Sequence, residues 1–223
     1  MSFVLLQNDI TMVKKRNTFL KKYIEFELIH GRSPNSVFEF CKENKTDEAS
    51  FYEHFNSIQQ LKKAILKDQI DGTLVLLDDS EDYKNYSARE KVLALFFTQF
   101  EQFKSIRSYL IEKYQDKKGV IDNAKDWDDF FNQLQARIEG ILVEAKQNEE
   151  VQDRPYIGEH YAKGFKLVFT YVFRVWLKDE SHAFETTDAA IEKTINLAFD
   201  MLGVSPLDSL LDFGRFAIKT KVF

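Results

Sequence analysis

The side chains that most often carry out catalysis or bind metals are scattered in this sequence. Asp126, Asp128 and Asp129 resemble a metal cluster, but acidic residues spaced in this way more often stabilise the first turn of a helix. Neither a glycine-rich phosphate loop nor a nucleophile elbow is present. The histidines lie far apart and lack a second ligand at metal-binding spacing: His30, His54, His160 and His182. We expect no enzyme activity and no cofactor, and only a buried carboxylate–histidine pair would reopen that question.

Contact with nucleic acid is the chemistry that the first third of the chain favours. Residues 1–67 hold eleven Lys and Arg against eight Asp and Glu, which gives +3. The remaining 20 Lys and Arg and 28 Asp and Glu give −8. A basic front and an acidic rear suit a protein that offers only its front to a polyanion.

The composition predicts an all-α protein. Only 3 prolines and 8 glycines occur in 223 residues, fewer than strands and their tight turns normally need. The single cysteine, Cys41, excludes an internal disulfide framework, and we interpret it as a small buried apolar residue. No secretory signal or membrane-spanning apolar run is visible, so the expected location is the cytoplasm.

Apolar periodicity and capping residues place the expected helices. Residues 1–13 form a flexible or partly helical arm. Val37, Phe38 and Cys41 form the inner face of the second helix, and Thr46 or Asp47 caps the third. An acidic loop covers 78–86. The expected helices span about 17–30, 34–43, 47–55, 57–74, 87–118, 126–148, 156–178, 187–202 and 207–218.

Residues 19–66 resemble the N-terminal domain of the TetR family of helix-turn-helix repressors. The family pattern has an amphipathic helix that ends at a glycine, here Gly31, and a hydroxyl residue that starts helix two, here Ser36. The third helix ends in Tyr-x-x-Phe, and the sequence Phe-Tyr-Glu-His-Phe at 51–55 is the most specific match. The resemblance implies a three-helix helix-turn-helix domain at 1–67 and a larger helical domain for ligand binding and dimerisation at 68–223.

The resemblance also implies how DNA would be bound. The short third helix would enter the major groove, and Ser36 would bind a phosphate at a helix N-terminus. Basic residues before and within the first helix would add attraction that does not depend on sequence: Lys14, Lys15, Arg16, Lys21 and Lys22. The turn and the third helix would contact operator DNA through Lys45, Thr46, Ser50, Tyr52 and His54.

Three positions depart from the family pattern. Lys45 stands where the family usually has a glycine, Glu48 replaces a small or basic residue, and Ile58 replaces a lysine. Asp47, Glu48 and Glu53 make the recognition helix acidic, which repels phosphates, although glutamate can accept a hydrogen bond from cytosine.

Aromatic residues recur at helical spacing in the second domain. They are interpreted either as ordinary core and dimer interface or as the lining of a pocket for a small apolar or aromatic ligand. Arg137, Lys166 or Arg174 could pair with a carboxylate on such a ligand. The candidate ligand-binding residues are Phe96, Phe100, Phe103, Trp127, Phe131, Phe165, Phe169 and Phe173.

Two functions from different classes follow. The first is a homodimeric repressor that binds operator DNA and is released by the ligand; its dimer would pair the last long helices across a two-fold axis. The alternative is a protein of the same fold that has lost DNA binding and carries a lipid, a quinone or another apolar ligand.

Overall fold

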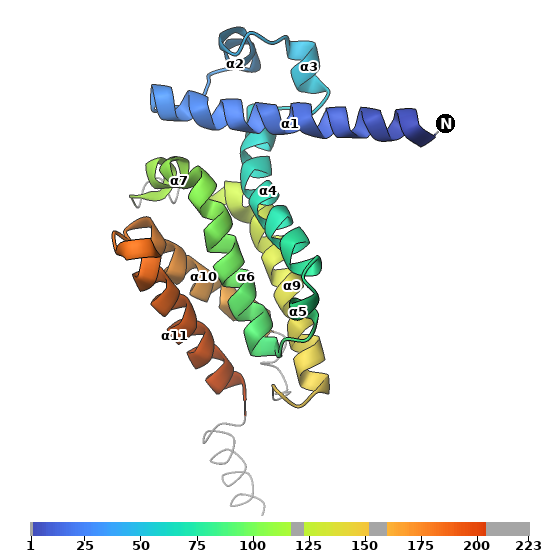
Figure 1. Cartoon of the computed structure of the whole chain (residues 1–223). Coiled ribbons are helices and arrows are strands. Elements are labelled where there is room, and N and C mark those ends of the chain that lie inside the picture. Colours follow the sequence, from blue (N-terminus) through green and yellow to red (C-terminus); the bar gives the residue numbers. More distant parts are fainter. Residues whose placement is uncertain (1, 117–122, 152–159, 204–223) are drawn as a thin grey trace, which may run out of the picture. The chain divides into compact units, whose positions relative to one another are not determined.

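The chain is helical throughout the parts that the structure describes, as the composition predicts. A computed structural model describes residues 2–116, 123–151 and 160–203, and these contain helices but no strand (Figure 1). The expected helix at 207–218 lies outside the described residues. The elements are α1 (Ser2–His30), α2 (Val37–Glu43), α3 (Glu48–Tyr52), α4 (Ile58–Asp78), α5 (Glu81–Lys84), α6 (Ala88–Phe103), η1 (Lys104–Ile106), α7 (Arg107–Tyr114), η2 (Ala124–Trp127), α9 (Asp128–Gln147), α10 (Tyr161–Leu177), η4 (His182–Phe184) and α11 (Glu185–Leu202).

The described helices differ from the expected ones at their ends. The first helix starts at Ser2 rather than near Asn17, so the arm continues α1 without a break. The long helix expected at 87–118 is interrupted, since η1 separates α6 from α7. The acidic stretch at 78–86 was expected to be a loop, yet it contains α5, because Ser80 accepts a hydrogen bond from the Tyr83 amide and caps a turn of helix.

Two compact units make up the chain. The first contains residues 1–73 and 101–132, and the second contains 74–100 and 133–223. This differs from a division after residue 67, because the chain returns to the first unit through η1, α7 and η2. The division into an N-terminal and a C-terminal functional domain stays a prediction.

The first unit is built on α1, along which α2 and α3 pack through aromatic side chains (Figure 1). Gly31 ends α1 with a positive φ of 62°, a conformation that glycine adopts without strain, and its amide donates to the Glu27 carbonyl at 2.8 Å. Cys41 is buried, as expected. The expected inner face of α2 was wrong at Phe38, which is 60% exposed, while Phe40 is fully buried.

The second unit has its core between α6, α10 and α11. The Phe169 ring lies 5.7 Å from that of Phe96 and 5.3 Å from that of Phe100. Asp179 joins α10 to α11 by accepting four hydrogen bonds of 2.6–2.9 Å from the amides and hydroxyls of Ser181 and Thr187. Burial works against its charged form, but these bonds hold the pKa of Asp179 at about 2. The Asp179 carboxylate therefore stabilises the turn between α10 and α11.

Candidate nucleic-acid interface

An aromatic cluster holds α2 and α3 against α1. Phe51 lies 5.7 Å from Phe19, 5.9 Å from Phe40 and 5.8 Å from Phe55, measured between ring centroids. Phe51 and Phe55 are 0% and 2% exposed, so the most specific part of the sequence motif serves the core of the helix-turn-helix. Tyr52 lies between them in sequence and is 50% exposed, which leaves its side chain available to a partner.

Side chains cap the first turns of both helices. Ser36 Oγ accepts from the Glu39 amide at 3.0 Å, and Asp47 Oδ1 accepts from the Ser50 amide at 2.7 Å. Asp47 is thus the cap of α3, which settles the choice between Thr46 and Asp47. The hydrogen of the exposed Ser36 hydroxyl is not used in this cap, because the oxygen is the acceptor; its predicted contact with a phosphate stays a prediction.

Part of the negative charge of this region is already paired within it. Glu39 accepts from Arg32 at 2.6 Å and from the Asn35 amide at 2.5 Å. The Arg32 hydrogen bond is the main reason why the pKa of Glu39 falls to about 2. Asp47 is used by the α3 cap, so Glu48 and Glu53 are the remaining acidic residues of the recognition helix.

The turn between the helices places Lys45 in the left-handed region, with φ of 52°. Its amide donates to the Lys42 carbonyl at 3.3 Å, and the Thr46 amide donates to the Cys41 carbonyl at 3.0 Å. A residue with a Cβ is strained in this conformation, whereas glycine adopts it freely. The Lys45 side chain is exposed.

Replacing Lys45 with glycine is expected to raise the free energy of unfolding by about 0.5–1 kcal/mol, because it removes this strain. Chemical denaturation of the purified variant measures the change. Lys45→Asn is the matched control, since asparagine tolerates the same conformation better than lysine, and should lie between the two. A variant Lys45→Gly less stable than the wild type would contradict the strained turn.

The basic residues expected to face DNA divide into exposed and engaged ones. Lys14 and Lys15 are exposed on α1. Arg16 instead holds both oxygens of Asp68 on α4 at 2.7 and 2.8 Å, and its guanidinium lies 5.6 Å from the Phe55 ring. Arg16 therefore already joins α1 to α4.

Other predicted contacts also have structural partners. Lys22 donates to the Asn44 carbonyl at the end of α2, at 2.8 Å, while Lys21 is exposed. His54 packs its ring 5.7 Å from that of Phe19, with Nε2 buried, and burial lowers the pKa of His54. Thr46 and Ser50 are half-buried.

The candidate ligand-binding aromatics fall into two separate groups. In the first unit, Phe103 and Trp127 lie 6.0 Å apart, and Phe131 lies 5.5 Å from Trp127. The other group is in the second unit: Phe96, Phe100, Phe165, Phe169 and Phe173. Most of these rings are buried against one another, as core residues are. Their role as a ligand lining stays a prediction.

Among the three cations that could bind a ligand carboxylate, the structure places Arg137 in a cavity with Tyr83, a residue that sequence reasoning missed. Arg174 lines a slightly smaller pocket that also includes Asp179, and Lys166 is exposed. The sequence did not indicate Tyr83, because its burial depends on α5 and the sequence predicts an acidic loop at those residues.

Metal and membrane sites find no support in the described parts of the chain. Residues 2–116, 123–151 and 160–203 contain no group of three or more His, Cys, Asp or Glu placed to hold a metal ion. The histidine–carboxylate contacts His30–Glu43 and His182–Glu185 are not buried. Within the same residues, no helix is both long and apolar enough to cross a membrane.

Comparisons with known proteins agree with this architecture. The family of tetracyclin repressor-like C-terminal domains matches residues 91–217, more than half of the chain. The fold resembles that of a protein assigned to the TetR-family transcriptional regulators from Syntrophomonas wolfei str. Goettingen, with a TM-score of 0.66 and 13% identity over 86% of this chain and 98% of that one. It also resembles a protein of unknown function from Rhodococcus sp. RHA1, with a TM-score of 0.55 and 13% identity over 85% and 96%. No curated protein sequence matches the chain.

Proposed function

The chain belongs to the TetR family of transcriptional regulators, and we propose that it is a repressor that binds operator DNA as a homodimer and is released by a small ligand. The observation that carries the proposal is the capped helix-turn-helix, whose α3 exposes Tyr52 while Phe51 is buried. Exposed Lys14, Lys15 and Lys45 would attract the phosphate backbone.

Exposed apolar residues on α10 and α11 support the dimer. Leu167 and Tyr171 lie one turn apart on α10 and are 75% and 54% exposed. Leu197 and Met201 lie one turn apart on α11 and are 60% and 63% exposed. The two helices pack on each other, and apolar residues exposed at i, i+4 spacing on both favour a partner helix pair from a second copy.

A second function keeps the fold and the ligand but not DNA binding. It is favoured by the orientation of His54, whose ring packs into the core, and by Glu53, which is exposed at the end of the recognition helix. The engagement of Arg16 with Asp68 also leaves fewer cations for phosphates. In this case α2 and α3 would only contribute to the packing of the first unit, and the protein would carry an apolar molecule.

Binding to DNA from the upstream region of its own gene, titrated with salt, separates the two functions. The repressor should bind this DNA far more tightly than a scrambled duplex, and the logarithm of its affinity should fall linearly with the logarithm of the salt concentration. Equal binding to both duplexes, or none, by a folded dimer would favour the carrier.

Tyr52→Ala is expected to weaken site-selective binding about tenfold or more while the affinity for scrambled DNA stays nearly unchanged. The loss would follow from removal of an exposed side chain that the core does not need. Fluorescence anisotropy with labelled duplexes measures both affinities. Tyr86→Ala is the matched control, because Tyr86 is an exposed tyrosine of the other unit, and equal effects of the two substitutions would contradict the assignment of α3 as the recognition helix.

A further inference from the structure

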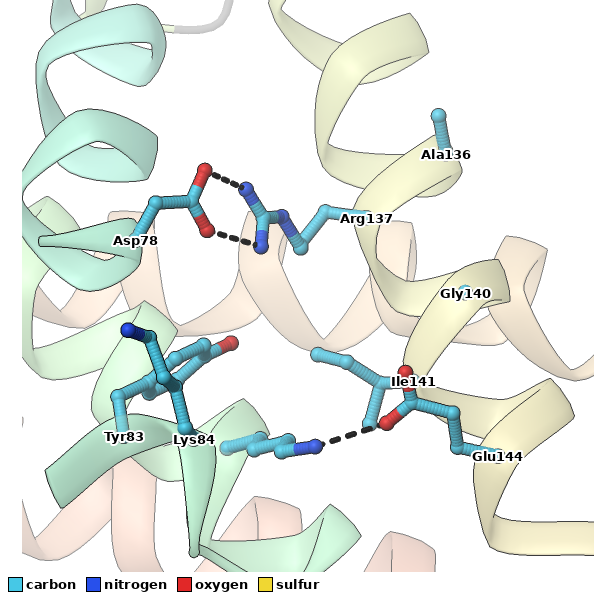
Figure 2. Close-up of a pocket in the computed structure, with 9 residues that line it drawn as sticks. Asp78, Tyr83, Lys84, Ala136, Arg137, Gly140, Ile141 and Glu144 are labelled. Atoms are coloured by element: carbon cyan, nitrogen blue, oxygen red, sulfur yellow. Dashed lines mark hydrogen bonds and ion pairs between the residues drawn. The ribbon is translucent and has the colours of Figure 1, made fainter. Parts of the chain in front are cut away.

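A charged cavity of about 500 Å³ lies in the second unit, between the end of α4, α5, the start of α6 and residues 136–144 of α9. Figure 2 shows Asp78 and Arg137 facing each other on one side, and the Tyr83 hydroxyl directed across the cavity toward Ile141. The volume is in the range of small-molecule sites. Its charged residues set it apart from the aromatic clusters considered above.

Two ion pairs line the cavity, and in both the cation is the more buried member. Arg137 binds both oxygens of Asp78 at 2.7 Å, with side-chain exposures of 24% and 57%. Lys91 donates to Glu144 at 2.8 Å, with exposures of 17% and 61%. The more exposed carboxylate of each pair can rotate toward the solvent at little cost in free energy. The less exposed cation that it leaves behind then needs another anion as its partner.

The Tyr83 hydroxyl supplies an unused hydrogen-bond donor. The residue is 6% exposed, and its buried Oη donates no hydrogen bond within the described part of the chain. The neighbouring Arg137 guanidinium can only donate to this oxygen, so the hydroxyl hydrogen stays free. Burial raises the pKa of Tyr83, although the Arg137 guanidinium acts against that increase. The phenol therefore stays protonated and can donate, and a buried donor without an acceptor favours a ligand that provides one.

We propose that this cavity binds a small organic carboxylate, which replaces Asp78 on Arg137 and accepts a hydrogen bond from Tyr83. Asp78 already demonstrates the geometry, since Arg137 grips its carboxylate with two parallel hydrogen bonds. Ile141 and Ala136 supply apolar contacts for the rest of the ligand. A cationic ligand is disfavoured, because in both ion pairs the carboxylate is far more exposed to solvent than the cation and is the member that can leave the cavity.

This site deepens the proposed ligand response and rests on that function only for its effect on DNA. Binding itself involves residues of the second unit alone. A calorimetric titration without DNA can therefore fail or succeed independently of operator binding.

The test titrates the full chain with sodium benzoate, sodium octanoate, inorganic phosphate and benzylammonium chloride in a chloride buffer. The proposal expects at least one of the two carboxylates to bind with Kd of about 1 mM or tighter, and benzylammonium not to bind. Binding of phosphate alone would overturn the choice of a carboxylate. Binding of none of the four would overturn the site.

Two substitutions should move the carboxylate affinity in opposite directions. Tyr83→Phe removes only the hydroxyl and should weaken binding about tenfold with little change in the melting temperature, because the hydroxyl donates to no protein acceptor and Arg137 keeps its two bonds to Asp78. Asp78→Ala removes the competing carboxylate and should strengthen binding several-fold. Tyr86→Phe, on an exposed neighbour, is the control and should leave the affinity unchanged. Unchanged affinity in both Tyr83→Phe and Asp78→Ala would contradict the proposal.

Discussion

Phe40→Ala is expected to lower the free energy of unfolding by about 3–5 kcal/mol, the cost of emptying a fully buried phenylalanine site. The Phe40 ring lies 6.3 Å from Phe19, 6.0 Å from Tyr23 and 5.9 Å from Phe51. Its removal therefore opens a cavity where α1, α2 and α3 meet. Urea denaturation followed by circular dichroism measures the loss, and operator binding should be lost with it if α2 and α3 detach.

Phe38→Ala provides the matched control on the same helix. Phe38 is 60% exposed, and its described contact is with Lys42, whose Nζ lies 5.8 Å from the ring centroid. An exposed cation–π contact contributes about 0.5–1 kcal/mol, so the variant should remain close to wild type. Similar losses in the two variants would contradict the observed orientation of α2.

Lys113→Ala is expected to destabilise the protein by about 3–5 kcal/mol, because it leaves a buried carboxylate without its cation. Lys113 Nζ lies 2.7 Å from Glu27 Oε2, and the two side chains are only 9% and 5% exposed. Glu27 also accepts hydrogen bonds from Tyr23 and Ser33, so it is held in place and cannot turn toward water. The pair joins α1 to α7 within the first unit.

A double-mutant cycle with Glu27→Gln tests whether the buried charge causes this effect. The double variant Glu27→Gln/Lys113→Met has no unpaired charge. Its loss of stability should therefore be smaller than the sum of the losses in the single variants Glu27→Gln and Lys113→Met. Denaturation midpoints of the four proteins give the coupling free energy. Additive losses would show that Lys113 acts through packing alone, contrary to the expected ionic contribution.

The Glu27–Lys113 pair also connects α7 to α1, the helix on which α2 and α3 pack. Because α1 supports α2 and α3 through Phe19, any displacement of α7 would act on α1 through Glu27 and Lys113. Sequence reasoning missed the pair, since its members are 86 residues apart and each has ordinary helical neighbours. The same holds for the contact of Asp126, which lies in the first turn of η2 as expected but is also 3% exposed and accepts from Gln59 at 2.6 Å.

Features that depend on neighbours along the chain could be predicted from the order of the amino acids. Scarce glycine and proline, together with apolar periodicity, were enough for an all-helical fold. Caps act over three or four residues, so the expected helix start at 57 and the expected helix end at 202 agree with the structure. Ser57 accepts a hydrogen bond from the Gln60 amide at the start of α4, and Gly203 follows the last residue of α11. The motif at 51–55 was equally local, and the burial of Phe51 and Phe55 follows from it.

Which of these residues face one another depends on how the helices pack. A helix of 7 residues, such as α2, is too short for periodicity to distinguish Phe38 from Phe40, so packing against α1 made that choice. The sequence predicts that Arg16 contacts DNA, whereas the structure pairs it with Asp68, which is 52 residues away along the chain. The cavity around Arg137 likewise brings together side chains from α4, α5, α6 and α9. Such contacts form when separate helices bury their apolar faces against one another. A local sequence pattern cannot predict which charged side chains this packing brings together.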